Sequence, residues 1–204
     1  MLPVALLIAG AARGEEQTPE LQTRAATTWE SGIGSGFTEN TIAVGLSFGA
    51  GIGTDAFGST VAHDLALGAV GVSWIFTGVQ APDHWYRGNW EWRNELFGGS
   101  QINPDSRYLF GWVPLLRYDF ATGTRWVPFL TVGAGLCGTD IDDYDLSGKF
   151  QFCPQAGFGT HYFVRDNLAL TAEFRWMHLS NAGLEQPNRG VNTAMFYTGV
   201  NWFF

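Results

Sequence analysis

A chain of 204 residues is long enough for one sizeable domain and short for two. Its 19 acidic and 11 basic side chains give a formal net charge of -8, which argues against a nucleic-acid surface, because phosphate binding needs clustered lysine and arginine. Aromatic residues form 15% of the chain, and its 27 glycines far exceed the average usage of about 7%. The composition therefore favours many short strands joined by tight turns.

The first twelve residues are apolar and end in the small residues Ala9, Gly10 and Ala11, before the sequence changes to RGEEQTPE. This pattern resembles the apolar region and cleavage site of a secretory signal peptide, except that the positively charged start is missing. We expect residues 1–12 to be such a signal, with a truncated or misassigned start. The alternative is an apolar N-terminal tail. Residues 13–38 are expected to form a polar, poorly ordered lead-in.

From about residue 40 onward, apolar and polar side chains alternate, which is the pattern of β-strands. In the stretch NWEWRNEL, Trp90 and Trp92 share one face, while Glu91 and Arg93 share the other. The same division recurs in FLTVGAGLC, KFQFCPQAGFGTH and LALTAEFRWMH. The uncharged run over residues 65–82 contains glycines and ends in proline, so a strand is favoured there over a membrane helix.

Two arrangements of these faces are open. The apolar face points inward in a soluble sandwich or lipocalin, and toward lipid in an outer-membrane barrel. Three features favour the membrane barrel: the many aromatic residues on the apolar face, the glycines on the polar face of a narrow lumen, and the last strand, NTAMFYTGVNWFF. The terminal Phe204 of that alternating strand resembles the assembly signal of bacterial outer-membrane barrels. The barrel assembly machinery is therefore an expected partner.

Eight candidate strands lie near residues 40–53, 63–78, 87–97, 106–119, 126–138, 148–163, 167–180 and 191–204. Eight is the smallest usual number for a closed membrane barrel, and closure satisfies the backbone hydrogen bonds that lipid cannot satisfy. The predicted fold is an all-β, eight-stranded antiparallel transmembrane outer-membrane β-barrel over residues 39–204. Connectors after strands four and six are short, as on a periplasmic side, whereas those after strands one, three, five and seven are longer. The roughly ten-residue connector after strand two is the exception to this rule.

The two cysteines, Cys137 and Cys153, are symmetric about position 145, and both lie on the polar face. Cross-strand neighbours in a hairpin have that symmetry, so an interior disulfide is expected in an oxidising periplasm. Two free, small, buried thiols are the alternative. Two cysteines cannot form the usual four-ligand zinc site, and His63, His84 and His161 are scattered, so no metal is expected.

The strand that ends in FRWMHLSNAG places His178 and Ser180 on the apolar face, together with Phe174 and Trp176. An imidazole and a hydroxyl facing lipid are costly, which suggests that they act there. Residues two apart on a strand lie about 7 Å apart at Cα, so the imidazole can serve as general base while the serine attacks an ester carbonyl. The alternative is a polar turn at the strand end, since His-x-Ser alone is a weak motif.

The longer run HLSNAGLEQPNRG closely resembles the signature of the lipid A 3-O-deacylase (PagL) family, and DLSGKFQF, residues 145–152, is similar to that family's segment between strands five and six. The resemblance is specific over about residues 126–204 and architectural before them. It implies an eight-stranded barrel in the outer membrane of a Gram-negative bacterium. Such a barrel hydrolyses the ester-linked acyl chain at position 3 of lipid A in lipopolysaccharide, among outer-membrane lipids and without a cofactor.

The resemblance also implies roles for single residues. Ser180 is the expected nucleophile and His178 its base. Contacts to the oxyanion or the substrate are expected from Asn181, the turn of Ala182 and Gly183, and Asn188. Removing one oxyanion donor typically costs about 100- to 1000-fold in rate.

The family pattern has a glutamate, the third member of a Ser-His-Glu triad, where this sequence has Asn192. Hairpin symmetry about residue 185 places Asn192 opposite His178, so the position is right and the charge is missing. An amide oxygen can still fix the imidazole tautomer, but it cannot offset the charge formed during attack. Glu185 could substitute only if its loop folds back, and Glu173 should face the lumen. A glutamate at 192 should preserve or raise activity unless the site is built around the amide.

Three functions follow as alternatives. The first is an outer-membrane serine esterase acting on lipid A, with His178 and Ser180 near the outer end of the barrel. The second is a catalytically weak or inactive relative, a structural or lipid-binding barrel in which Asn192 marks lost catalysis. The third is a soluble lipocalin-like binder. The sequence leaves the acyl-chain preference and the oligomeric state open.

Overall fold

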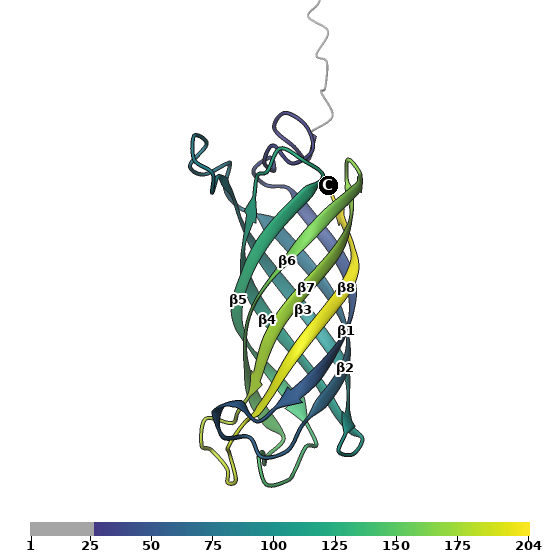
Figure 1. Ribbon diagram of the computed structural model, residues 1–204, viewed down its shortest axis with the longest axis vertical. Helices are drawn as coiled ribbons and strands as arrows, with labels where there is room; N and C mark the ends of the chain where they lie inside the picture. Colours follow the sequence, from purple (N-terminus) through teal and green to yellow (C-terminus); the bar gives the residue numbers. More distant parts are fainter. Residues whose placement is uncertain (1–26) are drawn as a thin grey trace, which may run out of the picture.

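The computed structural model describes residues 27–204, so the expected signal peptide lies outside the described residues. Eight antiparallel strands close into one barrel in chain order, as Figure 1 shows. The strands are β1 (Ile42–Thr54), β2 (Asp64–Ile75), β3 (Gly88–Asn103), β4 (Arg107–Phe120), β5 (Trp126–Thr139), β6 (Phe150–Arg165), β7 (Leu168–Leu179) and β8 (Val191–Phe203). One 3-10 turn, η1 (Ala56–Gly58), follows β1. Within residues 27–204, no helix is long and apolar enough to cross a membrane.

The eight predicted strands are confirmed, and the largest change in bounds is in β3. This strand continues to Asn103, so that only residues 104–106 separate it from β4. The prediction of a longer connector after strand three is therefore wrong. Gly98 and Gly99, which are typical turn residues, instead pair with Gly68 and Leu67 of β2. The connectors at 121–125 and 166–167 are short, and the one at 76–87 is the long exception.

The alternation along each strand divides a lipid-facing outer surface from a polar lumen. In β3, Trp92 is 42% exposed on the outside, whereas Glu91, Arg93 and Glu95 are each at most 3% exposed on the inside. Charges in the lumen and aromatic residues outside are the arrangement of an outer-membrane barrel. The soluble lipocalin-like alternative, which needs the apolar face inside, is contradicted.

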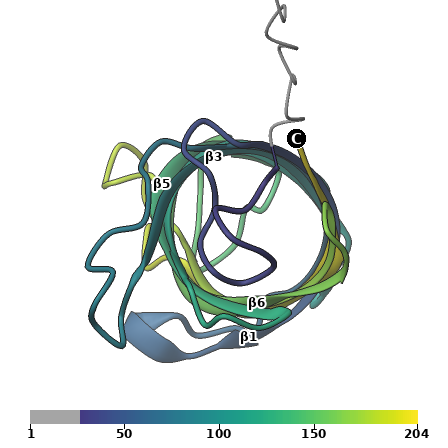
Figure 2. The same ribbon diagram turned by 90° about the horizontal axis from the view of Figure 1, so that it is seen from above.

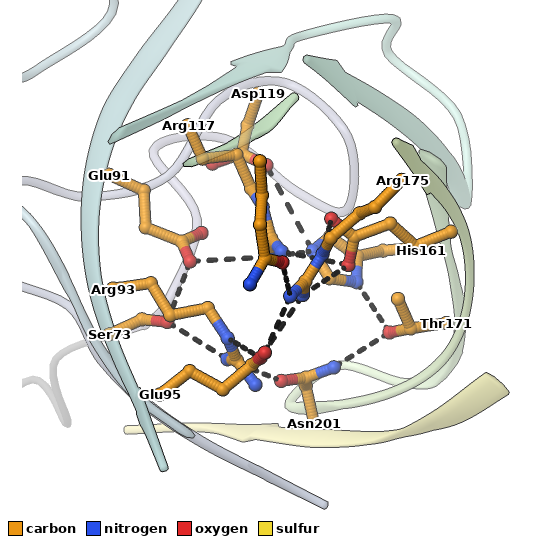
Figure 3. A network of polar contacts seen from close by, with 12 residues as sticks. Ser73, Glu91, Arg93, Glu95, Arg117, Asp119, His161, Thr171, Arg175 and Asn201 are labelled. Atoms are coloured by element: carbon orange, nitrogen blue, oxygen red, sulfur yellow. Dashed lines mark hydrogen bonds and ion pairs between the residues drawn. The ribbon is translucent and has the colours of Figure 1, made fainter. Parts of the chain in front are cut away.

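The middle of the lumen is filled by a network of ion pairs, which Figure 3 shows from close by. Its members include the arginines and glutamates Arg93, Arg117, Arg175, Glu91, Glu95 and Glu173. Arg117 Nη1 lies 3.3 Å from Glu91 Oε1, and its Nη2 lies 3.2 Å from Glu173 Oε2. Gly71 has to be glycine, because a Cβ there would collide with the guanidinium of Arg93. Glycine on the polar face thus provides the room that the sequence pattern predicted.

Residues 27–38 close the end of the lumen that carries the short connectors. In Figure 2 this segment, in purple, crosses the opening of the barrel. Trp29 and Phe37 are buried and stacked with ring centroids 4.3 Å apart, and Phe37 stacks on Phe203 at 5.0 Å. Trp29 Nε1 donates a hydrogen bond to the carbonyl of Asp166. Residues 27–38 are therefore ordered, in contrast to the prediction of a poorly ordered lead-in over residues 13–38, the first part of which lies outside the described residues.

The cysteines face the lumen as predicted, but the strand register differs from the prediction. The β5–β6 hairpin pairs Cys137 with Gln151 and Cys153 with Gly135, so the two cysteines are diagonal neighbours and not directly opposite. Both are buried, free thiols in this structure. The symmetry axis of the hairpin lies at position 144, one residue before the position 145 that direct pairing of the two cysteines requires.

Candidate active site

The outer ends of β7 and β8 carry the residues that the sequence singled out. The hairpin register pairs His178 with Asn192, as symmetry about residue 185 predicted. Ser180 continues the ladder beyond β7, since its N–H donates to the carbonyl of Phe152 at 3.1 Å and its carbonyl accepts from the N–H of Phe152 at 2.8 Å. These backbone bonds hold His178 and Ser180 on the outward face, where both side chains are half-buried.

The imidazole of His178 is oriented by a buried amide. Asn192, which is fully buried, places its Oδ1 2.8 Å from His178 Nδ1, while its Nδ2 donates to the carbonyl of Ala56 at 2.7 Å. A carbonyl oxygen can only accept, so the contact with Ala56 assigns the nitrogen and the oxygen of the amide. Asn192 Oδ1 must then accept from Nδ1–H, which leaves the lone pair of the neutral imidazole on Nε2.

Gly190 packs directly against the imidazole of His178. A Cβ at this position would collide with His178 Cε1, and the backbone φ of +88° lies in the left-handed region that favours glycine. Both the close approach and the backbone conformation therefore require glycine here. The last glycine of the motif thus packs against His178 and restricts the position of its ring.

The hydroxyl of Ser180 lies among polar groups of its own loop, and its Oγ donates to Asn188 Oδ1 at 3.2 Å. Asn188 Nδ2 donates to Ser180 Oγ at 3.1 Å, and the N–H of Ala182 donates to it at 3.2 Å. Asn188 Oδ1 accepts from the N–H of Asn181 at 3.1 Å, which fixes the direction of the amide. The hydrogen bonds among residues 27–204 do not join His178 to Ser180 directly. Such catalytic bonds are often long before a substrate binds.

The side chain of Asn181 is occupied within the protein, in contrast to its expected role at the oxyanion. Its Nδ2 donates to the carbonyls of Ser147 and Glu185, and its Oδ1 accepts from the N–H of Gly183. The residue is buried and links the β5–β6 loop to the β7–β8 loop. The geometry instead brings Asn188 and the N–H of Ala182 to the serine. The side chain of Glu185 is exposed beside Gly148.

A buried carboxylate joins three outer loops beneath the site. Asp145, on the β5–β6 loop, accepts hydrogen bonds from Ser59, Thr60 and Val61 of the β1–β2 loop at 2.7 to 3.1 Å. Burial raises the pKa of the Asp145 carboxyl, but the hydrogen bonds, above all from Thr60, hold the pKa below its ordinary value. The carbonyl of Asp145 also accepts from the N–H of Gly190 at 2.9 Å. This hydrogen bond therefore fixes the position of Gly190, which packs against His178.

An apolar groove of about 570 Å³ lies on the outer wall beside the imidazole. Its lining includes Phe57 of η1, Ala156 of β6, Trp176 and His178 of β7, and Arg189 of the β7–β8 loop. A groove that is mostly apolar and has a few polar groups at one end suits an apolar ligand with a reactive polar head. Neither Phe57 nor Arg189 could be found from the sequence, because both lie in loops without a periodic pattern.

Three buried groups in the lumen have ligand atoms close enough together for a metal ion. Glu91, Asp119 and His161 place these atoms within 4.8 Å of one another, although the histidines looked scattered in the sequence. However, Arg117 Nη1 lies 3.3 Å from Glu91 Oε1 and 3.4 Å from His161 Nε2. The guanidinium already provides the positive charge at this point, so these residues do not fit a metal ion well.

Comparison with known proteins gives the family. Residues 68–201, well over half of the chain, match the model of the family described as Lipid A 3-O-deacylase (PagL). The chain belongs to the PagL family. A curated relative, Lipid A deacylase PagL of Pseudomonas aeruginosa, is 30% identical over 95 residues, which cover 45% of this chain and 52% of the relative. The match thus spans about half the length of that PagL protein.

Solved structures show the same fold. The crystal structure of the outer membrane enzyme PagL aligns with a TM-score of 0.56 at 21% identity, over 76% of this chain and 97% of that one. Neisserial surface protein A aligns with a TM-score of 0.57 at 15% identity, over 81% and 100% of the two chains. Ail of Yersinia pestis aligns at 0.54 with 10% identity, over 82% and 100%. The predicted family, the barrel fold and the outer-membrane location are therefore confirmed for this PagL-family chain.

Proposed function

We propose that this protein is an outer-membrane ester hydrolase that removes the 3-O-linked acyl chain of lipid A, with Ser180 as nucleophile and His178 as general base. The observation that carries the proposal is the partly buried hydrogen bond between His178 Nδ1 and Asn192 Oδ1. It leaves the basic Nε2 of the imidazole on the outer wall, which Ser180 shares. Family membership and the similarity to a lipid A deacylase support the reaction class.

In the first step, His178 Nε2 takes the proton of Ser180 as Oγ attacks the acyl carbonyl carbon. The carbonyl oxygen becomes an oxyanion, for which Asn188 Nδ2 and the N–H of Ala182 are the nearby donors. The imidazolium then gives its proton to the departing sugar oxygen as the ester bond breaks. Water, activated by the same imidazole, hydrolyses the acyl-serine and releases the fatty acid.

The position of the site suits a lipid substrate. The site lies at the end of the barrel opposite the short turns at 121–125 and 166–167, and short turns belong to the periplasmic side. Ser180 and His178 therefore lie toward the outer leaflet. The groove beside them opens on the lipid-facing wall, so that an acyl chain can enter it from the membrane.

Asn192 sets the efficiency of this base. The amide fixes the tautomer as a carboxylate would, but it carries no charge to stabilise the imidazolium. This single observation favours a second candidate function, a catalytically weak or inactive barrel that binds lipid. The two functions differ only in whether an acyl chain leaves lipid A.

The test is to express the chain in a Gram-negative host and to weigh the lipid A by mass spectrometry. We expect the loss of one hydroxyacyl chain, abolished by Ser180→Ala and by His178→Ala. Ser106→Ala and His84→Ala, at exposed positions away from the site, are matched controls that should retain the loss. Unchanged lipid A from a correctly inserted barrel would refute the esterase and favour the inactive barrel.

A further inference from the structure

The β1–β2 loop reaches the proposed active site in a way that the motif does not show. Its 3-10 turn η1 places the Ala56 carbonyl on the amide of Asn192 at 2.7 Å. The next residue, Phe57, is 81% exposed and turns its ring edge toward Trp176, with centroids 6.2 Å apart and planes at 80°. One short turn therefore contacts both the partner of the base and the wall of the groove.

The backbone of Phe57 adopts a conformation that is unusual for its residue type. Its φ of 55° and ψ of 22° lie in the left-handed region, where a bulky non-glycine residue is rare. Such a conformation is unfavourable for this residue type and persists only where the surrounding structure fixes it. Here the Ala56 carbonyl is held by Asn192, and residues 59–61 are held by Asp145. The fixed turn keeps an exposed aromatic ring beside the groove.

We propose that Phe57 is a specificity-determining residue, whose ring forms one wall of the acyl-chain groove and selects the length of the chain that is cleaved. The proposal rests on the proposed esterase function. Ala156 and Trp176 are held on barrel strands, whereas Phe57 lines the same groove from a loop. The substrate class is the hydrocarbon chain of a fatty-acyl ester. The Ala56 carbonyl accepts a hydrogen bond from Asn192, and the same amide contacts His178. The position of the turn that carries Phe57 is therefore linked to the orientation of the imidazole.

Contacts between chain and pocket discriminate modestly but measurably, since one methylene group in an apolar pocket changes kcat/KM by about 10- to 200-fold. Removing the ring in Phe57→Ala should widen the groove and shift the preference toward longer or bulkier acyl chains. A larger ring in Phe57→Trp should narrow it and shift the preference toward shorter ones. Opposite shifts are not expected if Phe57 only supports the fold.

The experiment measures kcat/KM for a series of esters that differ only in acyl length, using the folded full chain in detergent or vesicles. We expect the ratio of long-chain to short-chain kcat/KM to rise about tenfold in Phe57→Ala and to fall in Phe57→Trp. Tyr144→Ala removes another exposed aromatic ring of the outer loops, outside the groove. This matched control should keep the wild-type ratio.

The outcomes separate the two proposals. Unchanged ratios, or a uniform loss at every chain length in both Phe57 variants, would overturn the role of Phe57 while the wild-type activity stands. A shift of the same size in Tyr144→Ala would also overturn it. If the folded wild-type protein cleaves no ester of the series, the proposed function fails, and the selection of acyl chains by Phe57 fails with it.

Discussion

The N–H of Gly190 donates a 2.9 Å hydrogen bond to the carbonyl of Asp145, and the imidazole of His178 rests on Gly190. The imidazole is thus supported by a loop that lies more than thirty residues before it in the chain. The same Asp145 holds the β1–β2 loop through its carboxylate. Three outer loops therefore meet at a site whose two proposed catalytic residues come from one strand end.

The amide at position 192 is predicted to be better suited to this site than the family's carboxylate. In Asn192→Glu, a longer side chain in a fully buried position would direct a carboxylate oxygen at the Ala56 carbonyl, where Asn192 now donates a hydrogen bond. Leaving such groups mismatched costs about 1–3 kcal/mol, so we expect kcat/KM to fall about tenfold or more. Asn192→Asp keeps the size and isolates the effect of charge. A gain in kcat on Asn192→Glu would show an imperfect triad member instead.

Substitutions of Asn188 and of Asn181 are predicted to have different effects on catalysis and stability. Asn188→Ala removes a donor beside Ser180 Oγ, and kcat should fall about 100- to 1000-fold with little change in KM. Asn181→Ala removes hydrogen bonds that hold the outer loops together. It should therefore lower the melting temperature of the protein as well as its activity. Steady-state kinetics and thermal unfolding of each purified barrel distinguish the two. A large kcat effect with full stability in Asn181→Ala would restore its expected oxyanion role.

The lumen contains one carboxylate more than its guanidinium groups pair. Asp119 is 1% exposed, and among the described residues neither of its carboxylate oxygens has a hydrogen-bond partner. We expect Asp119→Asn to stabilise the barrel by about 1–3 kcal/mol, because it replaces a buried carboxyl group, which His161 Nε2 approaches only to 3.9 Å, with a neutral amide. Glu95→Gln breaks pairs with Arg93 and Arg175 and should destabilise it by about 3–5 kcal/mol. Urea unfolding in vesicles measures both, and a less stable Asp119→Asn variant would contradict the prediction.

The loop connection through Asp145 is predicted to weaken in acid. The folded-state pKa of this carboxyl lies below its ordinary value, so its stabilising contribution is complete above about pH 4 and is lost as the pH falls through the lowered pKa. Hydrogen exchange over residues 55–63, corrected for the intrinsic rate, should accelerate in that range. Asp145→Asn should exchange fast even at pH 6, and Asp142→Asn, at an exposed position, should resemble wild type. Equal protection in wild type and Asp145→Asn at pH 6 would refute the role.

Periodicity predicted much of the fold, because lipid and a narrow lumen impose opposite demands on alternate residues. The alternation in NWEWRNEL correctly separated Trp92 from Glu91, and symmetry about residue 185 correctly paired His178 with Asn192. The glycines of β3 misled, because a sheet tolerates glycine where neighbouring backbones pair closely.

The loops escaped sequence analysis for a different reason. Phe57 and Asp145 reach the site through contacts between segments far apart in the chain, and such contacts leave no local pattern. Asn181 and Asn188 are chemically equivalent in the sequence, and only the folded loop shows which amide faces Ser180. The sequence therefore predicted which residue types lie at the strand end and in the loop, but it did not predict the direction of each side chain.

The aromatic closure of Trp29 and Phe37 has a consequence for the cell that hosts this protein. With one end of the lumen covered by stacked rings and its middle filled by paired charges, we expect the described part of the barrel to offer ions no continuous water path. Planar bilayers containing the protein should show no steady conductance, and its expression should leave the outer membrane as impermeable as before. An acyl chain of the proposed substrate would then reach the groove on the outer wall from within the leaflet, and not through the lumen.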